Sequence, residues 1–137
     1  MKFGVFTENG SLNSLPVFNS VINGLLKQGH EVVQNSMDVD VPVIWSLLWH
    51  GRMAPNQTIW ETFHSQNKKV LVIEVGNIKR NHTWKVGIDG INRKADFGPK
   101  NNGPDRVNKF NLKYLTWREK GEHIILCVQH EKSEQWK

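Results

Sequence analysis

The sequence predicts an α/β fold, a three-layer Rossmann-like domain with a mostly parallel sheet of about five strands. Short β-rich apolar runs occur along the chain and are separated by stretches with helical periodicity. The first 33 residues fit a strand, a helix and a second strand, which together make a βαβ unit. The run at 70–75 is apolar at nearly every position, which is typical of a strand buried on both faces.

The amino-terminal βαβ unit has a clear signal for each of its elements. Residues 2–7 alternate and are β-rich, and they predict the first strand. Pro16 suits the first turn of a helix, and Gly29 is expected to end that helix before a second strand begins at Glu31. Between them, apolar side chains recur at helical spacing: Val17, Phe18, Val21, Ile22, Leu25 and Leu26.

The link between the second and third strands is too short for a helix. Residues 38–42 form a polar connection that Pro42 interrupts, and Val43-Ile44-Trp45 then predicts a short buried strand. A direct hop of this kind can carry the chain to the far side of the first strand. We therefore favour the flavodoxin-like strand order 2-1-3-4-5, with the classical order 3-2-1-4-5 as the alternative.

The second half of the chain is less regular. Pro55 and Asn56 are expected to open a second helix, which ends near Lys68. Gly76 ends the strand at 70–75. The remaining expected elements are a short strand or hairpin edge at 84–88, a long loop at 93–105, a weak helix through Val107, Phe110 and Leu115, and a last core strand at 124–128.

Composition limits the class of protein. A chain of 137 residues fits one domain, taken here as residues 1–137. The single cysteine, Cys127, excludes an internal disulfide, and its apolar neighbours favour a buried structural thiol over a nucleophile. The first apolar run is too short for a signal peptide and no stretch could span a membrane, so a cytoplasmic location is expected.

Ligands of open parallel sheets bind at the carboxyl ends of the strands. The segments that follow the expected strands there are polar or small. Asn9 and Gly10 precede the first helix and could cradle a phosphate through backbone amides, although an ordinary turn explains them more simply. The candidate ligand-binding residues are Asn9, Gly10, Trp49, Gly51, Arg52, Gly76, Lys79, Arg80, Trp84 and His130, and the candidate bases are Glu74 and His50.

The stretch from Trp45 to Arg52 places two tryptophans beside a cation. Tryptophan stacks on sugars and bases, and arginine can pair a phosphate with two hydrogen bonds. Core packing is the simpler explanation for Trp45 and Trp49, whereas ligand contact is favoured for Arg52, which follows the permissive Gly51. The structural alternative for Arg52 is an ion pair with Asp38, Asp40 or Glu74.

Neither a metal site nor a cofactor is expected. The six histidines lack metal-ligand spacing, and no serine-nucleophile elbow is present. Asp38 and Asp40 form a D-x-D pattern that can hold a metal-bound diphosphate. Here the pattern precedes a strand instead of following one, so a solvated turn is favoured.

Three stretches carry a family resemblance: Val43 to Ala54, Glu74 to Arg80 with Thr83 to Val86, and Ile125 to His130 with Ser133, Gln135 and Trp136. Over roughly residues 16–136 the chain resembles the amino-terminal half of GT-B-like glycosyltransferases. These are similar to surface-polysaccharide and capsule-biosynthesis proteins and are met in marine bacteria and phages. The resemblance implies a domain that binds a sugar nucleotide or a carbohydrate acceptor at the carboxyl edge of the sheet.

The proteins it resembles continue into a second Rossmann-like domain, which usually holds most of the nucleotide-sugar donor. The resemblance therefore implies that this chain is inactive or incomplete alone and that its partner is a second Rossmann-like domain or chain, with a homo-oligomer as an alternative. Whether the chain is itself an enzyme stays open at this point.

Two other function classes are weighed against carbohydrate binding. The net charge of +5 favours anionic partners, and Lys79 to His82 with the basic residues Arg93, Lys94 and Lys100 would suit a nucleic-acid-binding module. No recognised nucleic-acid motif is present, so this class ranks second. A structural or assembly role, in which exposed tryptophans bury against a partner, is the third.

Overall fold

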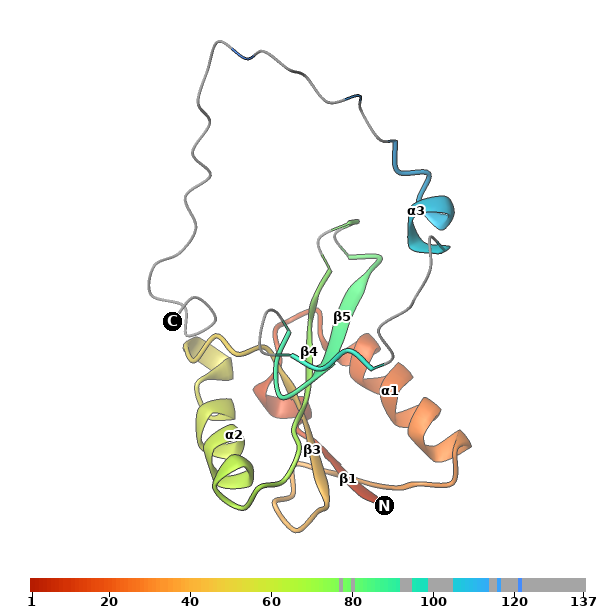
Figure 1. Ribbon diagram of the computed structural model, residues 1–137. Coiled ribbons are helices and arrows are strands. Elements are labelled where there is room, and N and C mark those ends of the chain that lie inside the picture. The colour runs from red at the N-terminus through yellow and green to blue at the C-terminus, as the bar shows by residue number, and fades with distance from the viewer. Residues whose placement is uncertain are drawn as a thin grey trace.

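A computed structural model describes residues 1–76, 78–79, 81–91, 95–98, 105–113, 116 and 121. Its centre is a five-stranded sheet of order β2-β1-β3-β4-β5 (Figure 1). The strands β1 to β4 pair in parallel, and β5 is antiparallel to β4. The predicted fold class and strand order are confirmed. The strand bounds are Lys2–Val5 for β1, Glu31–Gln34 for β2, Val41–Trp45 for β3, Leu71–Val75 for β4 and Trp84–Ile88 for β5.

The two longer helices cover opposite faces of the sheet (Figure 1). The helix α1 (Leu15–Lys27) connects β1 to β2, and α2 (Asn56–Ser65) connects β3 to β4. Each helix packs over its own apolar cluster. The cluster on the α1 side contains Val5, Phe18, Val43, Trp45 and Ile73, and the cluster on the α2 side contains Phe6, Val39, Ile44, Ile59, Phe63, Val70, Val72 and Ile91.

The central strand β3 begins earlier than expected. Pro42 was assigned to the connection before the strand, but it lies within β3 and pairs with Gly4 of β1. Pairing between β3 and β4 starts one residue later, at Val43. Pro42 therefore interrupts no hydrogen bond to β4, which explains how a residue without an N–H is accepted in a central strand.

The outer position beside β4 is taken by the hairpin strand β5. Residues 84–88 were expected as a short strand or hairpin edge, and the structure confirms this. The predicted core strand at 124–128, with Cys127, lies outside the described residues. The helix α3 (Asp105–Lys109) overlaps only the start of the expected weak helix: it contains Val107 but ends before Phe110, and Leu115 lies outside the described residues. Two 3-10 helices, η1 (Thr7–Asn9) and η2 (Gly51–Met53), follow β1 and β3.

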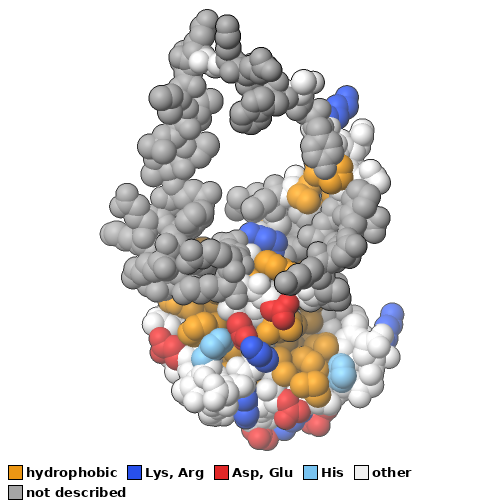
Figure 2. Space-filling view, in the orientation of Figure 1, with side chains coloured by type: hydrophobic (Ala, Val, Ile, Leu, Met, Phe, Trp, Pro, Cys, Tyr) orange, Lys and Arg blue, Asp and Glu red, His pale blue; other side chains and the backbone are white. Residues whose placement is uncertain are grey.

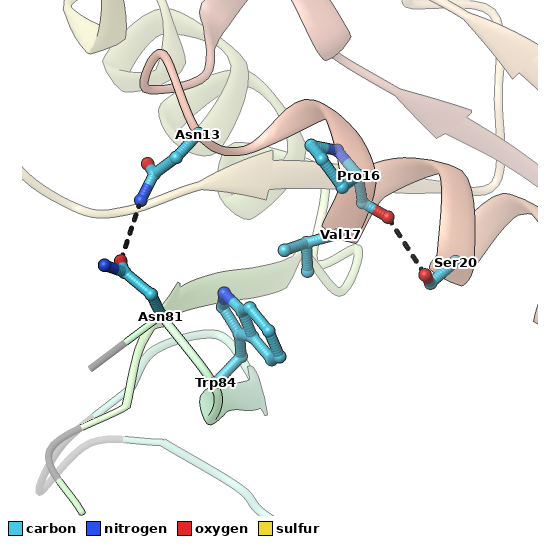
Figure 3. A pocket seen from close by; sticks show the side chains of 6 residues that line it. All are labelled: Asn13, Pro16, Val17, Ser20, Asn81 and Trp84. Atoms are coloured by element: carbon cyan, nitrogen blue, oxygen red, sulfur yellow. Dashed lines mark hydrogen bonds between the residues drawn. The ribbon is translucent and has the colours of Figure 1, made fainter. Parts of the chain in front are cut away.

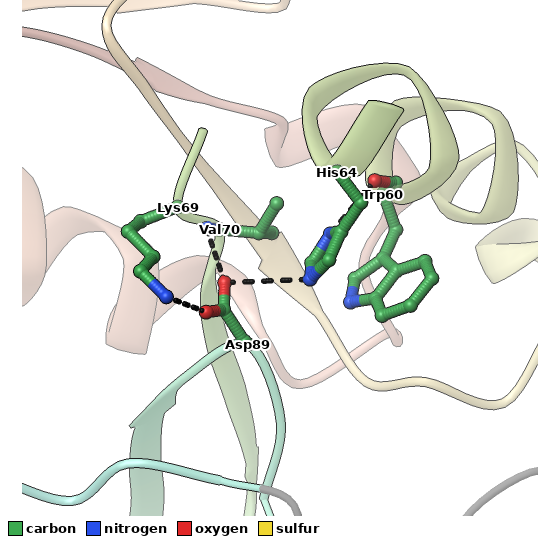
Figure 4. Close-up of polar contacts among 5 residues, drawn as sticks. All are labelled: Trp60, His64, Lys69, Val70 and Asp89. Carbon is green, nitrogen blue, oxygen red and sulfur yellow. Dashed lines mark hydrogen bonds and ion pairs between the residues drawn. The ribbon is translucent and has the colours of Figure 1, made fainter. Parts of the chain in front are cut away.

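A polar cluster joins α2 to the β4–β5 pair at the amino-terminal edge of β4 (Figure 4). One carboxylate oxygen of Asp89 accepts a 3.0 Å hydrogen bond from the Val70 backbone N–H, and the other accepts one of 2.7 Å from Lys69 Nζ. His64 Nε2 lies 3.5 Å from Asp89 Oδ1. The Asp89 carboxylate raises the pKa of Lys69 through this hydrogen bond. The cluster therefore connects the carboxyl end of α2 to the carboxyl end of β5.

No helix in the described part of the chain combines the length and the apolar character that crossing a membrane requires.

Candidate functional site at the carboxyl edge of the sheet

The carboxyl ends of β1 and β3 are neighbours, and the chain leaves them in opposite directions. The path from β1 passes through η1 to α1 on one face, and the path from β3 passes through η2 to α2 on the other. This is the position at which doubly wound sheets hold ligands. The two 3-10 helices contact each other. Arg52 and the Asn9–Gly10 loop therefore flank the same region.

Asn56 fixes the base of this region. Its side chain is fully buried at the start of α2. The Nδ2 group donates hydrogen bonds of 2.7 Å to the carbonyl oxygen of Trp45 and 3.1 Å to that of Asn9. The amide thus joins β3, η1 and α2. Sequence reasoning identified Asn56 only as a helix start, because nothing in the local pattern shows what its side chain contacts.

Ser46 turns the chain sharply at the end of β3. It is buried and has a positive φ of 65°, which is uncommon for a residue other than glycine. Its backbone N–H donates a 2.7 Å hydrogen bond to Ile73, and its Oγ accepts a 3.1 Å bond from the Leu48 N–H. These contacts hold the turn that leads to Trp49 and η2.

Two of the predicted ligand-binding glycines have packing reasons of their own. A Cβ on Gly10 would lie 2.8 Å from Phe18 Cε2, and a Cβ on Gly76 would lie 2.6 Å from the Thr83 carbonyl oxygen. At both positions the glycine backbone lies so close to neighbouring atoms that a side chain would not fit without a shift. Gly51 differs, because its surroundings are open and its φ is +57°, a left-handed conformation that glycine permits.

The predicted aromatic and basic residues after β3 have different environments. Trp45 is core, and its ring centroid lies 5.7 Å from that of Phe18. Trp49 is half-buried, with its ring centroid 6.4 Å from that of Trp60, so core packing also accounts for much of its surface. His50 and Arg52 are exposed. Lys79 is exposed as well, in the turn before β5, whereas Arg80 and His130 lie outside the described residues.

The D-x-D pattern lies at the other edge of the sheet. Asp38 Oδ2 accepts a 2.9 Å hydrogen bond from Lys2 Nζ, and Asp40 Oδ2 accepts one of 2.8 Å from the Lys2 backbone N–H. The bond from Lys2 lowers the pKa of Asp38. Neither carboxylate pairs with Arg52, and Glu74 accepts from the Val75 N–H instead. Within the described residues, no group of three or more His, Cys, Asp or Glu side chains is arranged to hold a metal ion.

Glu74 and Trp84 lie on opposite faces of the sheet. In the β4–β5 pair, Glu74 is opposite Lys85 and Val75 is opposite Trp84. Successive strand residues point to opposite faces, and Val75 packs in the cluster under α1. Trp84 therefore faces the α1 side and Glu74 the α2 side. The predicted base and the predicted stacking residue are separated by the sheet.

A pocket opens beside Trp84 where β5 begins, next to the first turns of α1 (Figure 3). Its volume is about 340 Å³, and its lining consists of Asn13, Pro16, Val17, Ser20, Asn81 and Trp84. We call it the Trp84 pocket. The indole ring lies beside Val17, and the residue Trp84 is 41% exposed. A large apolar ring open to solvent at the carboxyl end of β4 is available to a ligand.

The polar groups of the Trp84 pocket are amides and a hydroxyl. Asn13 Nδ2 donates a 3.3 Å hydrogen bond to Asn81 Oδ1, and Asn13 Oδ1 accepts a 2.7 Å bond from Ser11 Oγ. The Ser20 hydroxyl donates to the Pro16 carbonyl oxygen. These bonds orient both amides and leave Asn81 Nδ2 without an acceptor among the described residues. Among the lining residues, sequence reasoning identified only Trp84 as a carbohydrate contact, and Asn81 entered only within the stretch Lys79 to His82 that was weighed for nucleic-acid binding.

Among the described residues, charged side chains form no single-sign patch on the face shown in Figure 2. Basic, acidic and histidine side chains are intermixed there over the described residues. That arrangement does not resemble the basic stripe expected of a nucleic-acid-binding surface.

Comparisons with protein-family models, with curated proteins and with solved structures gave no match.

Proposed function

We propose that this domain binds a carbohydrate at the carboxyl edge of its sheet, as a glycosyltransferase-like half whose partner is a second Rossmann-like domain or chain. The ligand is a sugar nucleotide or a carbohydrate acceptor. The Trp84 pocket is the observation that carries the proposal.

The chemistry of the Trp84 pocket suits a sugar ring. The C–H groups on one face of a sugar pack against an indole, and its hydroxyls need donors and acceptors at the rim. Trp84 supplies the apolar surface, while Asn13, Asn81 and Ser20 supply neutral hydrogen-bonding groups. No charged side chain is among the residues that line it in the described part of the chain. A neutral polyhydroxylated ring fits this lining better than an anion does.

The position of the pocket supports the same proposal. It lies at the edge of the sheet where ligands of this architecture bind, and Asn81, which lies just before β5, contributes to its lining. Glu74 is on the other face, so we do not assign it as a base acting on a sugar in this pocket. His50 and Arg52 flank the neighbouring η1–η2 region and stay candidates for contacts to other parts of the ligand.

A titration followed by the indole N–H signals in NMR tests the proposal. Neutral monosaccharides and disaccharides are added to millimolar concentration, with the Trp84 signal assigned from the Trp84→Phe variant. We expect saturable shifts of that signal and loss of binding in Trp84→Ala. Val86→Ala is the control, because Val86 is exposed on the same strand but does not line the pocket. A Trp84 signal unmoved by every sugar would overturn the proposal, as would burial of Trp84 in a self-associated form.

A further inference from the structure

His64 lies in the last turn of α2, between two hydrogen-bond acceptors (Figure 4). Its Nδ1 atom is 3.0 Å from the backbone carbonyl oxygen of Trp60. Its Nε2 atom is 3.5 Å from Oδ1 of Asp89, the residue that follows β5. Both side chains of this contact are partly buried, with 29% of His64 and 19% of Asp89 exposed. Both ring nitrogens are therefore aimed at oxygens that accept hydrogen bonds and do not donate them.

A neutral imidazole does not satisfy both contacts of His64. It carries a proton on one ring nitrogen and a lone pair on the other. With the proton on Nδ1, the lone pair of Nε2 faces the Asp89 carboxylate. With the proton on Nε2, the lone pair of Nδ1 faces the carbonyl oxygen of Trp60. The imidazolium form carries both protons, so it can donate toward both oxygens.

Two further features of the surroundings favour a positive charge on His64. The imidazole ring stacks on the indole of Trp60, with ring centroids 3.7 Å apart and an interplanar angle of 22°. A cation above the face of a tryptophan ring is attracted by the negative charge of that face. His64 also lies in the last turn of α2, where the helix dipole stabilises a cation.

Lys69 is the charged group that opposes this effect. It shares the Asp89 carboxylate with His64, because its Nζ donates a 2.7 Å hydrogen bond to the other oxygen. The Lys69 side chain is 69% exposed, so solvent screens its charge more than that of the partly buried pair. On the described parts of the elements that meet at His64, the charged side chains are Glu61 of α2, Lys68 and Lys69 before β4, Asp89 after β5, and Asp96, which bridges to Ile88.

We propose that His64 forms a pH-sensitive connection between α2 and β5, which strengthens when the imidazole takes up a proton. In mild acid, the Nε2–H group donates to the Asp89 carboxylate, and the imidazolium ion pairs with it. As the pH rises, the ring loses a proton and one of its two contacts loses the donor. The stabilising contribution is therefore present in acid and is lost as the pH rises through the range in which histidine titrates, about pH 5 to 8. This connection lies at the amino-terminal edge of β4 and is independent of carbohydrate binding.

An NMR titration of the histidine ring signals over this pH range tests the contact directly. The His64 signal is assigned by its absence in His64→Gln. We expect the midpoint of its titration to move to lower pH in Asp89→Asn, because this variant removes the negative charge but keeps an acceptor for the Val70 N–H. The signal of His82, which is exposed in the turn before β5, is the control and should keep its midpoint. An unchanged His64 midpoint in Asp89→Asn would overturn the inference.

Urea denaturation of the same variants measures what the contact contributes to stability. His64→Gln should raise the unfolding equilibrium constant, and the factor should be about twofold to fivefold larger near pH 5 than near pH 8. This pH dependence should disappear when His64→Gln is made in the Asp89→Asn background, since the carboxylate partner is then already absent. His82→Gln is the matched control and should show no such dependence. If His64→Gln changes the constant by the same factor at both pH values, His64 is a purely structural residue and the inference is wrong.

Discussion

The side chain of Asn56 joins α2 to the end of β3 by donating a 2.7 Å hydrogen bond to the carbonyl oxygen of Trp45. Its Nδ2 group also donates to Asn9, so one buried amide fixes the base of the η1–η2 region. Replacing Asn56 would remove this donor from both carbonyl groups. The geometry of the candidate site therefore depends on a residue that contacts no solvent.

Replacing Asn56 should destabilise the domain. Asn56→Ala leaves two carbonyl oxygens without this donor, and we expect the free energy of unfolding to fall by about 1–3 kcal/mol. Urea denaturation measures the change. Gln57→Ala is the control on the same helix, because the exposed side chain of Gln57 donates to Glu61 on the surface. Equal effects of the two substitutions would contradict the role assigned to Asn56.

Alanine substitutions at two glycines should have opposite effects on stability. Gly24 lies within α1 with open space around its Cα, so Gly24→Ala should stabilise the domain by about 0.5–1 kcal/mol through helix propensity. Gly76→Ala would place a methyl group against the backbone of Thr83 and should destabilise it by about 1–3 kcal/mol. Thermal melts of both variants check the signs. An unchanged melting temperature in Gly76→Ala would contradict this prediction, because it would show that the turn before β5 can shift to accept the added methyl group.

The sheet could be predicted because its signals are local. The apolar run at 70–75 and the helical spacing after Pro16 each depend on neighbouring residues. The strand order followed from a distance argument, since the stretch between Val33 and Val43 leaves no room for a crossover helix. The early start of β3 was missed because Pro42 is a poor strand former, and only the pairing with β4 shows why it is accepted.

The candidate site was predictable in its location but not in its residues. Asn13 and Asn81 meet across the Trp84 pocket although 68 positions separate them. Neither residue belongs to a motif, and their contact depends on β5 running antiparallel to β4. The separation of Glu74 from Trp84 likewise follows from the register of that pair. Periodicity predicts strands but does not determine their register, so these relationships needed the structure.

The pair formed by Lys2 and Asp38 should make stability depend on pH at both ends of the range. The hydrogen bond between them lowers the pKa of Asp38 and raises that of Lys2. The contribution of Asp38 is present above its unfolded pKa and is lost as the pH falls through its lower folded pKa. The contribution of Lys2 is present below its unfolded pKa and is lost as the pH rises through its higher folded pKa.

Asp38→Asn should accordingly lower the melting temperature slightly at neutral pH, because Asp38 is exposed, Lys2 is only partly buried and solvent screens the pair. The difference from the unaltered protein should shrink in acid and in strong base. Glu61→Gln is the control, since the partner of Glu61 is the neutral Gln57. A difference that stays constant across the pH range would refute the ion pair as its source.

Asp89 should contribute more to stability than the lysine that pairs with it. Its carboxylate accepts from the Val70 N–H, and its φ of +60° is tolerated better by aspartate and asparagine than by alanine. We expect Asp89→Ala to lower the free energy of unfolding by about 1–3 kcal/mol. Asp89→Asn should lower the free energy of unfolding less, because it keeps the acceptor for the Val70 N–H. Lys69 is exposed, so Lys69→Met should change the free energy of unfolding little. Chemical denaturation of the three variants ranks their free energies of unfolding. A loss of stability in Lys69→Met as large as that in Asp89→Ala would contradict the expected order.

Arg52 should affect anion binding and not stability. It lies in η2 beside the η1 loop, it is exposed, and it forms no ion pair with the described acidic residues. The structural alternative, a bridge to Asp38, Asp40 or Glu74, is not present. A guanidinium at this edge can hold a phosphate or a carboxylate with two hydrogen bonds, which the ammonium of lysine does not reproduce.

Arg52→Ala and Arg52→Lys should both weaken binding of inorganic phosphate and of glucuronic acid, as measured by NMR titration. Their free energies of unfolding should stay within about 0.5 kcal/mol of the unaltered protein, as expected for a surface position. Lys27→Ala removes an exposed charge at the far end of α1 and serves as the control for net charge. A clear loss of stability in Arg52→Ala with unchanged anion affinity would assign Arg52 a structural role instead, and equal weakening in Lys27→Ala would reduce the effect to general electrostatic attraction.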